Sequence, residues 1–345
     1  IDASISLRFG DENSLMNKPE ISGLLADMLK TGTSNRSKKQ ISDELDRIKT
    51  NISFSGAVNG LIININTDKQ NLSAALTLLD DMLRNPKFDE AEFDKIKIDV
   101  KADIEASKND PQTVAGEKLN KLSTNYPKGH PNYAASSDES LEDLAKVKLD
   151  DLKGYYKDFY GANNSISAFV GELDKKTVKD FLNKTFGKWD SKMKFATIVP
   201  KHFEVKGTTE TINTPDKTNA MLLANININV SETHPDFPAM YIANELLGGG
   251  AFLSSRIPQR LRENEGMSYG AGTFMNSNYR YDVSSWGIYA MFNPLYKGRL
   301  DSALHQEVDK ALKGGFTKDE LDKSKNAWLE GNKTSLGMND FLARQ

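Results

Sequence analysis

Cysteine is absent from all 345 residues of the sequence. This absence excludes disulfides, thiolate nucleophiles and thiolate metal ligands together. Histidine is scarce as well: the four histidines are His130, His202, His234 and His305, and no two of them have the spacing of metal ligands. We interpret each histidine as an ordinary residue, and the sequence shows no zinc site.

Charge of one sign and long apolar runs are also lacking. The 45 Lys and Arg residues are interspersed with 48 Asp and Glu residues, which gives a net charge of -3. Because nucleic-acid-binding proteins concentrate Lys and Arg in patches, we expect no nucleic-acid partner. Apolar runs such as residues 220–224 end at asparagines, whereas a membrane-spanning helix needs about 20 apolar residues. We therefore expect no membrane span.

Common catalytic motifs are missing too. The triplet Gly248-Gly249-Gly250 is not followed by the Gly-Lys-Ser/Thr that completes a phosphate-binding loop. The sequence contains no G-x-S-x-G, and no histidine lies near a candidate serine. Carboxylate pairs such as Asp80-Asp81 are typical of solvated helix faces. Nucleotide binding and serine hydrolysis are therefore not indicated.

One order of elements occurs twice along the chain: a strand, two helices, a hairpin and two more helices. In the first copy, residues 1–9 alternate between apolar and polar side chains, and Leu24, Leu25 and Met28 share one helical face. The first copy comprises residues 1–9, 21–30, 37–48, 51–58, 61–67, 71–84 and 88–107; the second comprises 220–230, 235–247, 255–265, 267–275, 283–292, 296–313 and 317–332. This repeat predicts an α+β fold of two homologous domains, each a mainly antiparallel sheet with helices on one face.

The domain boundaries follow from the segments between the two copies. Residues 112–122 and 149–160 have helical patterns, 165–170 a strand pattern, and Asp174 is placed to cap a helix that runs to Phe186. We interpret the first domain as residues 1–190, the linker as 191–206 and the second domain as 207–345. Tyr155 and Tyr160 are expected in the first core, because aromatic side chains bury large areas.

The most informative stretch runs from Leu246 to Phe274. Gly248-Gly249-Gly250 predicts a flexible loop, Ser254 and Ser255 can cap the helix that follows, and Pro258 falls in the first turn of that helix. Gly266 can supply the left-handed residue that closes it. Arg262 is thus expected at the helix C-terminus and Tyr269 on the strand that emerges beside it, next to the glycine loop.

This stretch resembles the C-terminal half of the pitrilysin/insulinase family of zinc metallopeptidases, which includes the mitochondrial processing peptidase. The family pattern is a Gly-rich turn followed by S-R-L-x-x-x-L-R-E-x-x-G-L-x-Y. This chain has Ser255-Arg256-Ile257, Leu261-Arg262-Glu263, Gly266-Met267 and Tyr269 in the same order and spacing, and the resemblance extends over nearly all of its residues. It implies that Arg262 and Tyr269 reach from a half that binds no metal to the substrate in the zinc site of another half.

The zinc-binding motif of that family is degenerate in this chain. A self-sufficient member carries H-x-x-E-H, in which two histidines hold Zn²⁺ and the glutamate activates the metal-bound water. Aligned through Met28-Leu29 and Gly32-Thr33, the three positions hold Gly23, Ala26 and Asp27, and the third-ligand position falls at Asp103. Asp27 and Asp103 without imidazole make a poor zinc site. We interpret both as solvated acids.

The resemblance gives Arg262 and Tyr269 a chemical role. A phenol can donate a hydrogen bond to the oxyanion of peptide hydrolysis, and a guanidinium can hold the adjacent carbonyl. The glycine triplet would let an extended peptide pass close to the backbone. From the residues alone, Arg262 could equally interact with the helix dipole and Tyr269 could simply suit a strand. The resemblance decides for the functional interpretation.

The sequence thus predicts a non-catalytic half or subunit of a pitrilysin-like zinc metalloendopeptidase, inactive alone. Its expected partner is an H-x-x-E-H half or subunit that carries the zinc, and its expected substrates are peptides or unfolded proteins; the chain itself needs no cofactor. The alternative is an inactive scaffold or peptide-binding protein of the same fold. A self-sufficient hydrolase with an Asp27/Asp103 metal site is least favoured. The compartment stays open, with a bacterial periplasm or cell envelope favoured, and the second domain is expected to stop before a further strand and helix.

Overall fold

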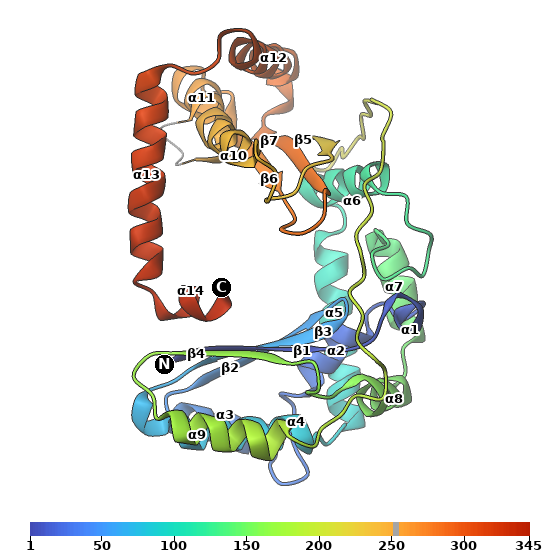
Figure 1. Cartoon of the computed structure of the whole chain (residues 1–345). Helices are drawn as coiled ribbons and strands as arrows, with labels where there is room; N and C mark the ends of the chain where they lie inside the picture. Colours follow the sequence, from blue (N-terminus) through green and yellow to red (C-terminus); the bar gives the residue numbers. More distant parts are fainter. Residues whose placement is uncertain (251–254) are drawn as a thin grey trace.

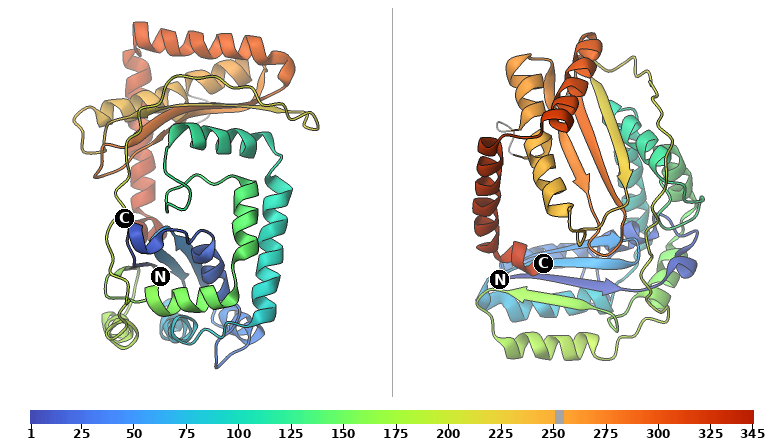
Figure 2. Two further views of the ribbon diagram at one scale, coloured as in Figure 1. Left: turned by 90° about the vertical axis from the view of Figure 1, so that its right-hand side faces the viewer. Right: turned by 45° about the horizontal axis from the view of Figure 1, so that its top comes forward.

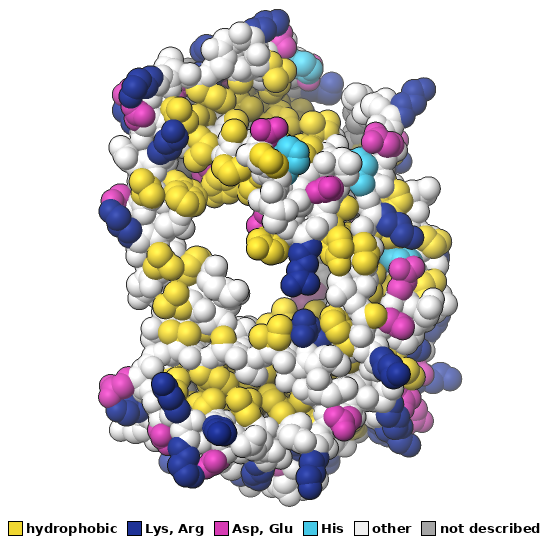
Figure 3. All heavy atoms as spheres, in the orientation of Figure 1, with side chains coloured by type: hydrophobic (Ala, Val, Ile, Leu, Met, Phe, Trp, Pro, Cys, Tyr) yellow, Lys and Arg dark blue, Asp and Glu magenta, His cyan; other side chains and the backbone are white. Residues whose placement is uncertain are grey.

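The computed structural model describes residues 1–250 and 255–345, which form two sheet-and-helix units around a central opening (Figures 1 and 3). The first unit contains a four-stranded antiparallel sheet in the order β2-β3-β1-β4. Its strands are β1 (Asp2–Arg8), β2 (Asn51–Ala57), β3 (Gly60–Asn66) and β4 (Ile166–Val170). Its helices are α1 (Glu12–Leu15), α2 (Ile21–Met28), α3 (Lys38–Arg47), α4 (Leu72–Arg84), α5 (Glu90–Ser107), α6 (Pro111–Ser123), α7 (Ser137–Lys146), α8 (Leu149–Phe159) and α9 (Lys175–Phe181), with η2 (Leu182–Phe186) extending α9.

Alternating side chains of β1 decide which face of this sheet is covered. Ala3, Ile5 and Leu7 are buried against the helices, and the residues between them are partly exposed on the other face. A capping box at Ser37 begins α3 as expected, since the Ser37 side chain accepts from the Gln40 N–H. Tyr155 and Tyr160 are buried in the core, which confirms their predicted place. The helices therefore cover one face and leave the other open (Figure 1).

The second unit repeats this arrangement with three strands in the order β5-β7-β6. Its strands are β5 (Ala220–Ile228), β6 (Ser268–Asn276) and β7 (Ser284–Phe292); its helices are α10 (Phe237–Asn244), η3 (Glu245–Gly249), α11 (Arg256–Pro258), η4 (Gln259–Asn264), α12 (Lys297–Gly314), α13 (Lys318–Leu336) and α14 (Asn339–Arg344). Matching β1, β2 and β3 with β5, β6 and β7 gives the same strand order in both sheets. The prediction of two homologous α+β domains is thereby confirmed.

Each unit sends a helix to the open face of the other sheet. The long helix α5 leads to α6, which lies against β5 of the second sheet, and the long helix α13 leads to α14, which lies against β1 and β4 of the first (Figures 1 and 2). A cavity of about 200 Å³ remains between α14 and the first sheet, with Ser4, Asn51 and Arg344 among its lining residues. The opening in Figure 3 is therefore closed on one side by α5 and α6 and on the other by α13.

The structure differs from the expected elements in a few places. The hairpin between β2 and β3 turns at Val58-Asn59, one residue earlier than the expected Asn59-Gly60, because Ala57 and Gly60 already pair. Helices α1 and α14 were not predicted, since they are short, and α7 was not predicted either. Residues 187–219 form no helix or strand, and the predicted linker, 191–206, falls within them.

Candidate functional site

Helix α2 carries the positions that match the zinc motif, and its side chains cannot hold a metal. Gly23 has no side chain, Ala26 is buried, and the Asp27 carboxylate pairs with Lys30 at 2.8 Å. Asp103 is exposed on α5, which packs beside α2. Within residues 1–250 and 255–345, no three His, Cys, Asp or Glu side chains form a group that could bind a metal ion. This helix therefore lacks the set of metal-binding side chains that a zinc peptidase uses.

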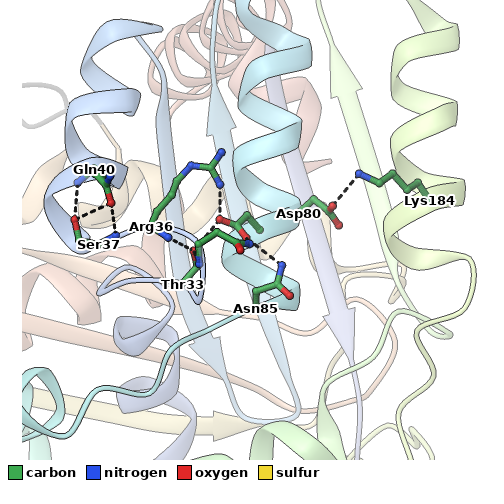
Figure 4. Close-up of polar contacts among 9 residues, drawn as sticks. Thr33, Arg36, Ser37, Gln40, Asp80, Asn85 and Lys184 are labelled. Carbon is green, nitrogen blue, oxygen red and sulfur yellow. Dashed lines mark hydrogen bonds and ion pairs between the residues drawn. The ribbon is translucent and has the colours of Figure 1, made fainter.

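The loop that follows α2 is held by one buried carboxylate, Asp81 on α4 (Figure 4). Asp81 accepts hydrogen bonds from the Thr33 hydroxyl at 2.7 Å and the Asn35 amide at 2.5 Å, and it pairs with the Arg36 guanidinium. Asn85, which directly follows α4, donates a further bond at 3.0 Å. Burial by itself would raise the pKa of Asp81, but these donors outweigh it and lower the pKa below the usual range. Asp81 is therefore ionised and fixes the loop's shape.

The glycine triplet lies at a helix end, which corrects the expectation of a flexible loop. Gly248 and Gly249 belong to η3, and Gly250 donates its N–H to the Glu245 carbonyl at 3.0 Å. A Cβ on Gly248 would lie 2.6 Å from the backbone nitrogen of Thr273, so only glycine lets the helix approach β6 this closely. Burial raises the pKa of Glu245 beside it. Gly248 thus has a packing role whether or not substrate passes here.

Arg262 lies on η4, close to the end of the helix as predicted. Gly266 has a φ of 60° and donates its N–H to the Arg262 carbonyl, so it closes the helix in the expected way. Ser255 occupies the N-cap position, but its side chain makes no capping hydrogen bond, and Ser254 lies outside the described residues. The Arg262 side chain is 49% exposed and contacts Glu263 at 3.8 Å. It is accessible to a ligand.

Tyr269 projects from a β-bulge at the start of β6. Ser268 pairs with Phe292 and Gly270 with Met291, so Tyr269 is the extra residue between two consecutive pairs. The Ser268 hydroxyl lies 2.8 Å from the carbonyls of both Gly270 and Met291 and accepts from the Gly270 N–H at 3.1 Å. Tyr269 itself is 62% exposed. The bulge therefore turns a phenol outward instead of pairing it in the sheet.

Ion pairs fix α11 and η4, and with them Arg262, on the helices behind. Arg260 pairs with Glu265 and with Glu307 of α12, each at 2.9 Å. Arg256 pairs with Glu320 of α13 at 2.8 Å, and its guanidinium lowers the pKa of Glu320 to about 2. A direct backbone bond from the Met267 N–H to the Leu261 carbonyl joins η4 to the start of β6. Arg262 and Tyr269 are thus carried by adjoining elements of a single packed unit.

The sequence of this chain matches a known protein family. Residues 12–133 match the family described as "Insulinase (Peptidase family M16)", and residues 146–328 match "Peptidase M16 inactive domain". The chain belongs to peptidase family M16. The predicted pitrilysin/insulinase resemblance is confirmed. Residues 146–328 of this chain match the family's inactive domain.

Individual M16 relatives support this assignment. "Uncharacterized zinc protease YmxG" of Bacillus subtilis (strain 168) is 25% identical over 311 residues, covering 89% of this chain and 73% of the relative. "Non-peptidase homolog YmxG" of Helicobacter pylori (strain ATCC 700392 / 26695) is 22% identical over 331 residues, covering 94% and 73%. The crystal structure of a peptidase M16 inactive domain from Pseudomonas fluorescens has a TM-score of 0.82 at 21% identity, covering 96% of this chain and 78% of that one. This last likeness shows the M16 fold.

Some residues that hold this candidate site in place were not found from the sequence. Ser268 holds the bulge, and Glu307 and Glu320 hold the helix, but none belongs to a motif. A signal did exist for the bulge: Gly270 and Gly272 interrupt a strand pattern, and glycine inside a strand often marks a bulge or a close backbone approach. The helices described here show no candidate for crossing a membrane, since none is both long and apolar enough.

Proposed function

We propose that this chain is the non-catalytic half or subunit of an M16 metalloendopeptidase, and that Arg262 and Tyr269 contact the substrate in a zinc site carried by an H-x-x-E-H partner. The observation that carries the proposal is the bulge at Ser268–Gly270, which leaves the Tyr269 phenol 62% exposed beside the helix of Arg262. A strand tyrosine with only a packing role would gain nothing from this geometry.

The two side chains suit a hydrolytic transition state. The Tyr269 phenol can donate to the oxyanion that develops during peptide hydrolysis, and the Arg262 guanidinium can hold a neighbouring peptide carbonyl with two parallel donors. The zinc in the partner would activate water and polarise the scissile carbonyl. Helix α2 of this chain, with Gly23, Ala26 and Asp27, would supply none of that chemistry.

The test is cleavage of a quenched fluorescent peptide by this chain, by the zinc-bearing subunit and by their mixture. We expect only the mixture to cleave, and Arg262→Ala/Tyr269→Phe to lower kcat by about 10²–10³, as loss of an oxyanion donor does. The matched control is Arg280→Ala/Tyr279→Phe in the β6–β7 turn, where Tyr279 is 66% exposed. This control should keep full activity.

The opposite result has a defined meaning. If the zinc-bearing subunit cleaves equally well alone, or with the Arg262/Tyr269 double variant, the two side chains play no part in turnover. The chain would then be an inactive scaffold or peptide-binding protein of the M16 fold, a role consistent with the "non-peptidase" name of its Helicobacter relative.

A further inference from the structure

The open faces of the two sheets differ in chemistry although the units share one fold. On the first sheet the register places mainly serine and asparagine on the open face, including Ser4, Ser53 and Asn64. On the second sheet the corresponding positions of β6 and β7 include Phe274, Tyr289 and Met291, all partly exposed. The first face is therefore mainly polar, and the second presents a cluster of larger apolar side chains.

Each of the two aromatic rings lies against a glycine of the neighbouring strand. Tyr289 pairs with Gly272, and a Cβ on that glycine would meet the tyrosine ring at 3.1 Å. Phe274 pairs with Gly287, where a Cβ would meet the phenylalanine ring at 2.2 Å. Any other residue at these two glycines would push the rings off the sheet. Phe274, Tyr289 and Met291 thus form an aromatic platform.

The strands that form the platform carry no charge. The open-face positions of β5, β6 and β7, as the structure describes them, hold no Asp, Glu, Lys or Arg. A charged peptide segment brought onto these strands would lose water without gaining an ionic partner from them, which is costly. An uncharged segment with apolar side chains would gain from burial. The methionine at position 291 adds adaptability to side chains of different shape.

The position of the platform places its ligand on β6 and β7. Helix α6 lies over β5 on the same face, where its Ser123 hydroxyl donates to Asn225 at 3.0 Å, so β6 and β7 are the part left open. This face borders the central opening seen in Figures 2 and 3, away from α10 and α12. The bulge that presents Tyr269 lies on β6 itself. An extended peptide could therefore contact the platform and Tyr269 together.

We propose that the platform of Phe274, Tyr289 and Met291 binds apolar, uncharged stretches of an extended polypeptide and so selects the substrate of this M16 chain. The inference rests on the proposed function, since it assigns the platform to the same substrate that Arg262 and Tyr269 would contact. The proposed substrates are unfolded segments rich in aliphatic or aromatic side chains. Basic and acidic peptides are excluded.

The test is fluorescence anisotropy with the chain alone and three labelled peptides of equal length: apolar and neutral, polar and neutral, and basic. We expect the apolar peptide to bind best, and Phe274→Ser/Tyr289→Ser to weaken its binding about tenfold or more, as loss of aromatic anchors does. Phe274→Leu/Tyr289→Phe should restore binding. The control is Ile62→Ser, which removes a 39% exposed apolar side chain from the open face of the first sheet and should change little. Circular dichroism establishes that each variant folds.

Two outcomes would overturn the proposal: equal or tighter binding of the polar or basic peptide, or unchanged binding of the apolar peptide by the folded double-serine variant. Because no partner subunit is present in this assay, its failure is separate from failure of the proposed function. The platform could bind apolar peptide while Arg262 and Tyr269 prove dispensable for the partner's turnover. The chain would then be a peptide-binding scaffold.

Discussion

At the scale of single residues, Asp81 shows how one ionised side chain can fix the conformation of a loop. It is 6% exposed, yet four donors from Thr33, Asn35, Arg36 and Asn85 satisfy its oxygens. Buried carboxylates are stable in proteins only when they are paired in this way. Because its pKa is lowered in the folded state, Asp81 stabilises the fold above the ordinary aspartate pKa of about 3.9, and this stabilisation is lost as the pH falls through the lowered pKa.

Asp81→Asn should therefore lower the free energy of unfolding by about 1–3 kcal/mol at pH 7, because the amide turns donors toward donors and leaves Arg36 without its carboxylate. The difference from the unmodified chain should shrink below about pH 4, because Asp81 becomes protonated first in the unfolded chain and then, below its lowered pKa, in the folded one. Urea unfolding at several pH values measures both effects.

The neighbouring Asp80 provides the control, since its pair with Lys184 at 3.2 Å lies at the surface (Figure 4). Asp80→Asn should cost about 0–1 kcal/mol at any of these pH values. If both substitutions cost the same, Asp81 does not organise the loop.

The limit of sequence reasoning is also visible at this scale. Tyr155, Tyr160 and Arg262 were placed correctly from periodicity and motif, because local patterns determine burial and helix ends. Asp81 was interpreted only as part of a solvated acidic pair, since its donors in residues 33–36 lie more than forty positions away in the sequence. Long-range polar contacts leave no local pattern.

At the scale of elements, strand β6 combines the close approach of η3 with the bulge at Tyr269. The strand-like composition of residues 267–275 predicted the strand, but the bulge was not predicted, because its position depends on the pairing with the neighbouring strand β7. The glycine triplet was misplaced for a related reason: glycine permits a loop, but here it permits the helix end to pack on Gly272 and Thr273. In both cases tertiary packing chose among conformations that the sequence allowed.

Ser268→Ala should release the bulge. Loss of the hydroxyl removes a hydrogen bond worth about 1–1.5 kcal/mol, so the Gly270 amide should exchange about tenfold faster. In the mixture with the zinc-bearing subunit, Ser268→Ala should also lower kcat. Ser268→Thr should restore both slow exchange at Gly270 and kcat. Ser285→Ala, on the adjoining strand, is the control. Slow exchange at Gly270 in Ser268→Ala would mean that the backbone alone maintains the bulge.

At the scale of the whole molecule, the relative placement of the two units is what the sequence leaves open. The repeat predicted two similar domains, but periodicity within each copy carries no information about α6 lying on β5 or α14 on β1. Side-chain hydrogen bonds join α6 to β5 on the side formed by α6. There, Tyr126 stacks on the buried His130 at 4.3 Å and accepts from the Lys201 N–H, which anchors the segment between the units.

Asn227 contributes two hydrogen bonds to that junction. Its side-chain amide donates to the Ser123 carbonyl at the end of α6 at 2.8 Å and to the Phe203 carbonyl at 2.9 Å, so one residue of β5 joins three segments. Asn227→Ala should lower the free energy of unfolding by about 1–3 kcal/mol and speed hydrogen exchange in α6, because two part-buried carbonyls lose their donor. Asn276→Ala, whose amide reaches Ser285 only at 3.4 Å, should do neither. Equal protection of α6 in both variants would show that apolar packing between α6 and β5 is enough to hold the two units together, and the opening would then keep its shape without this junction.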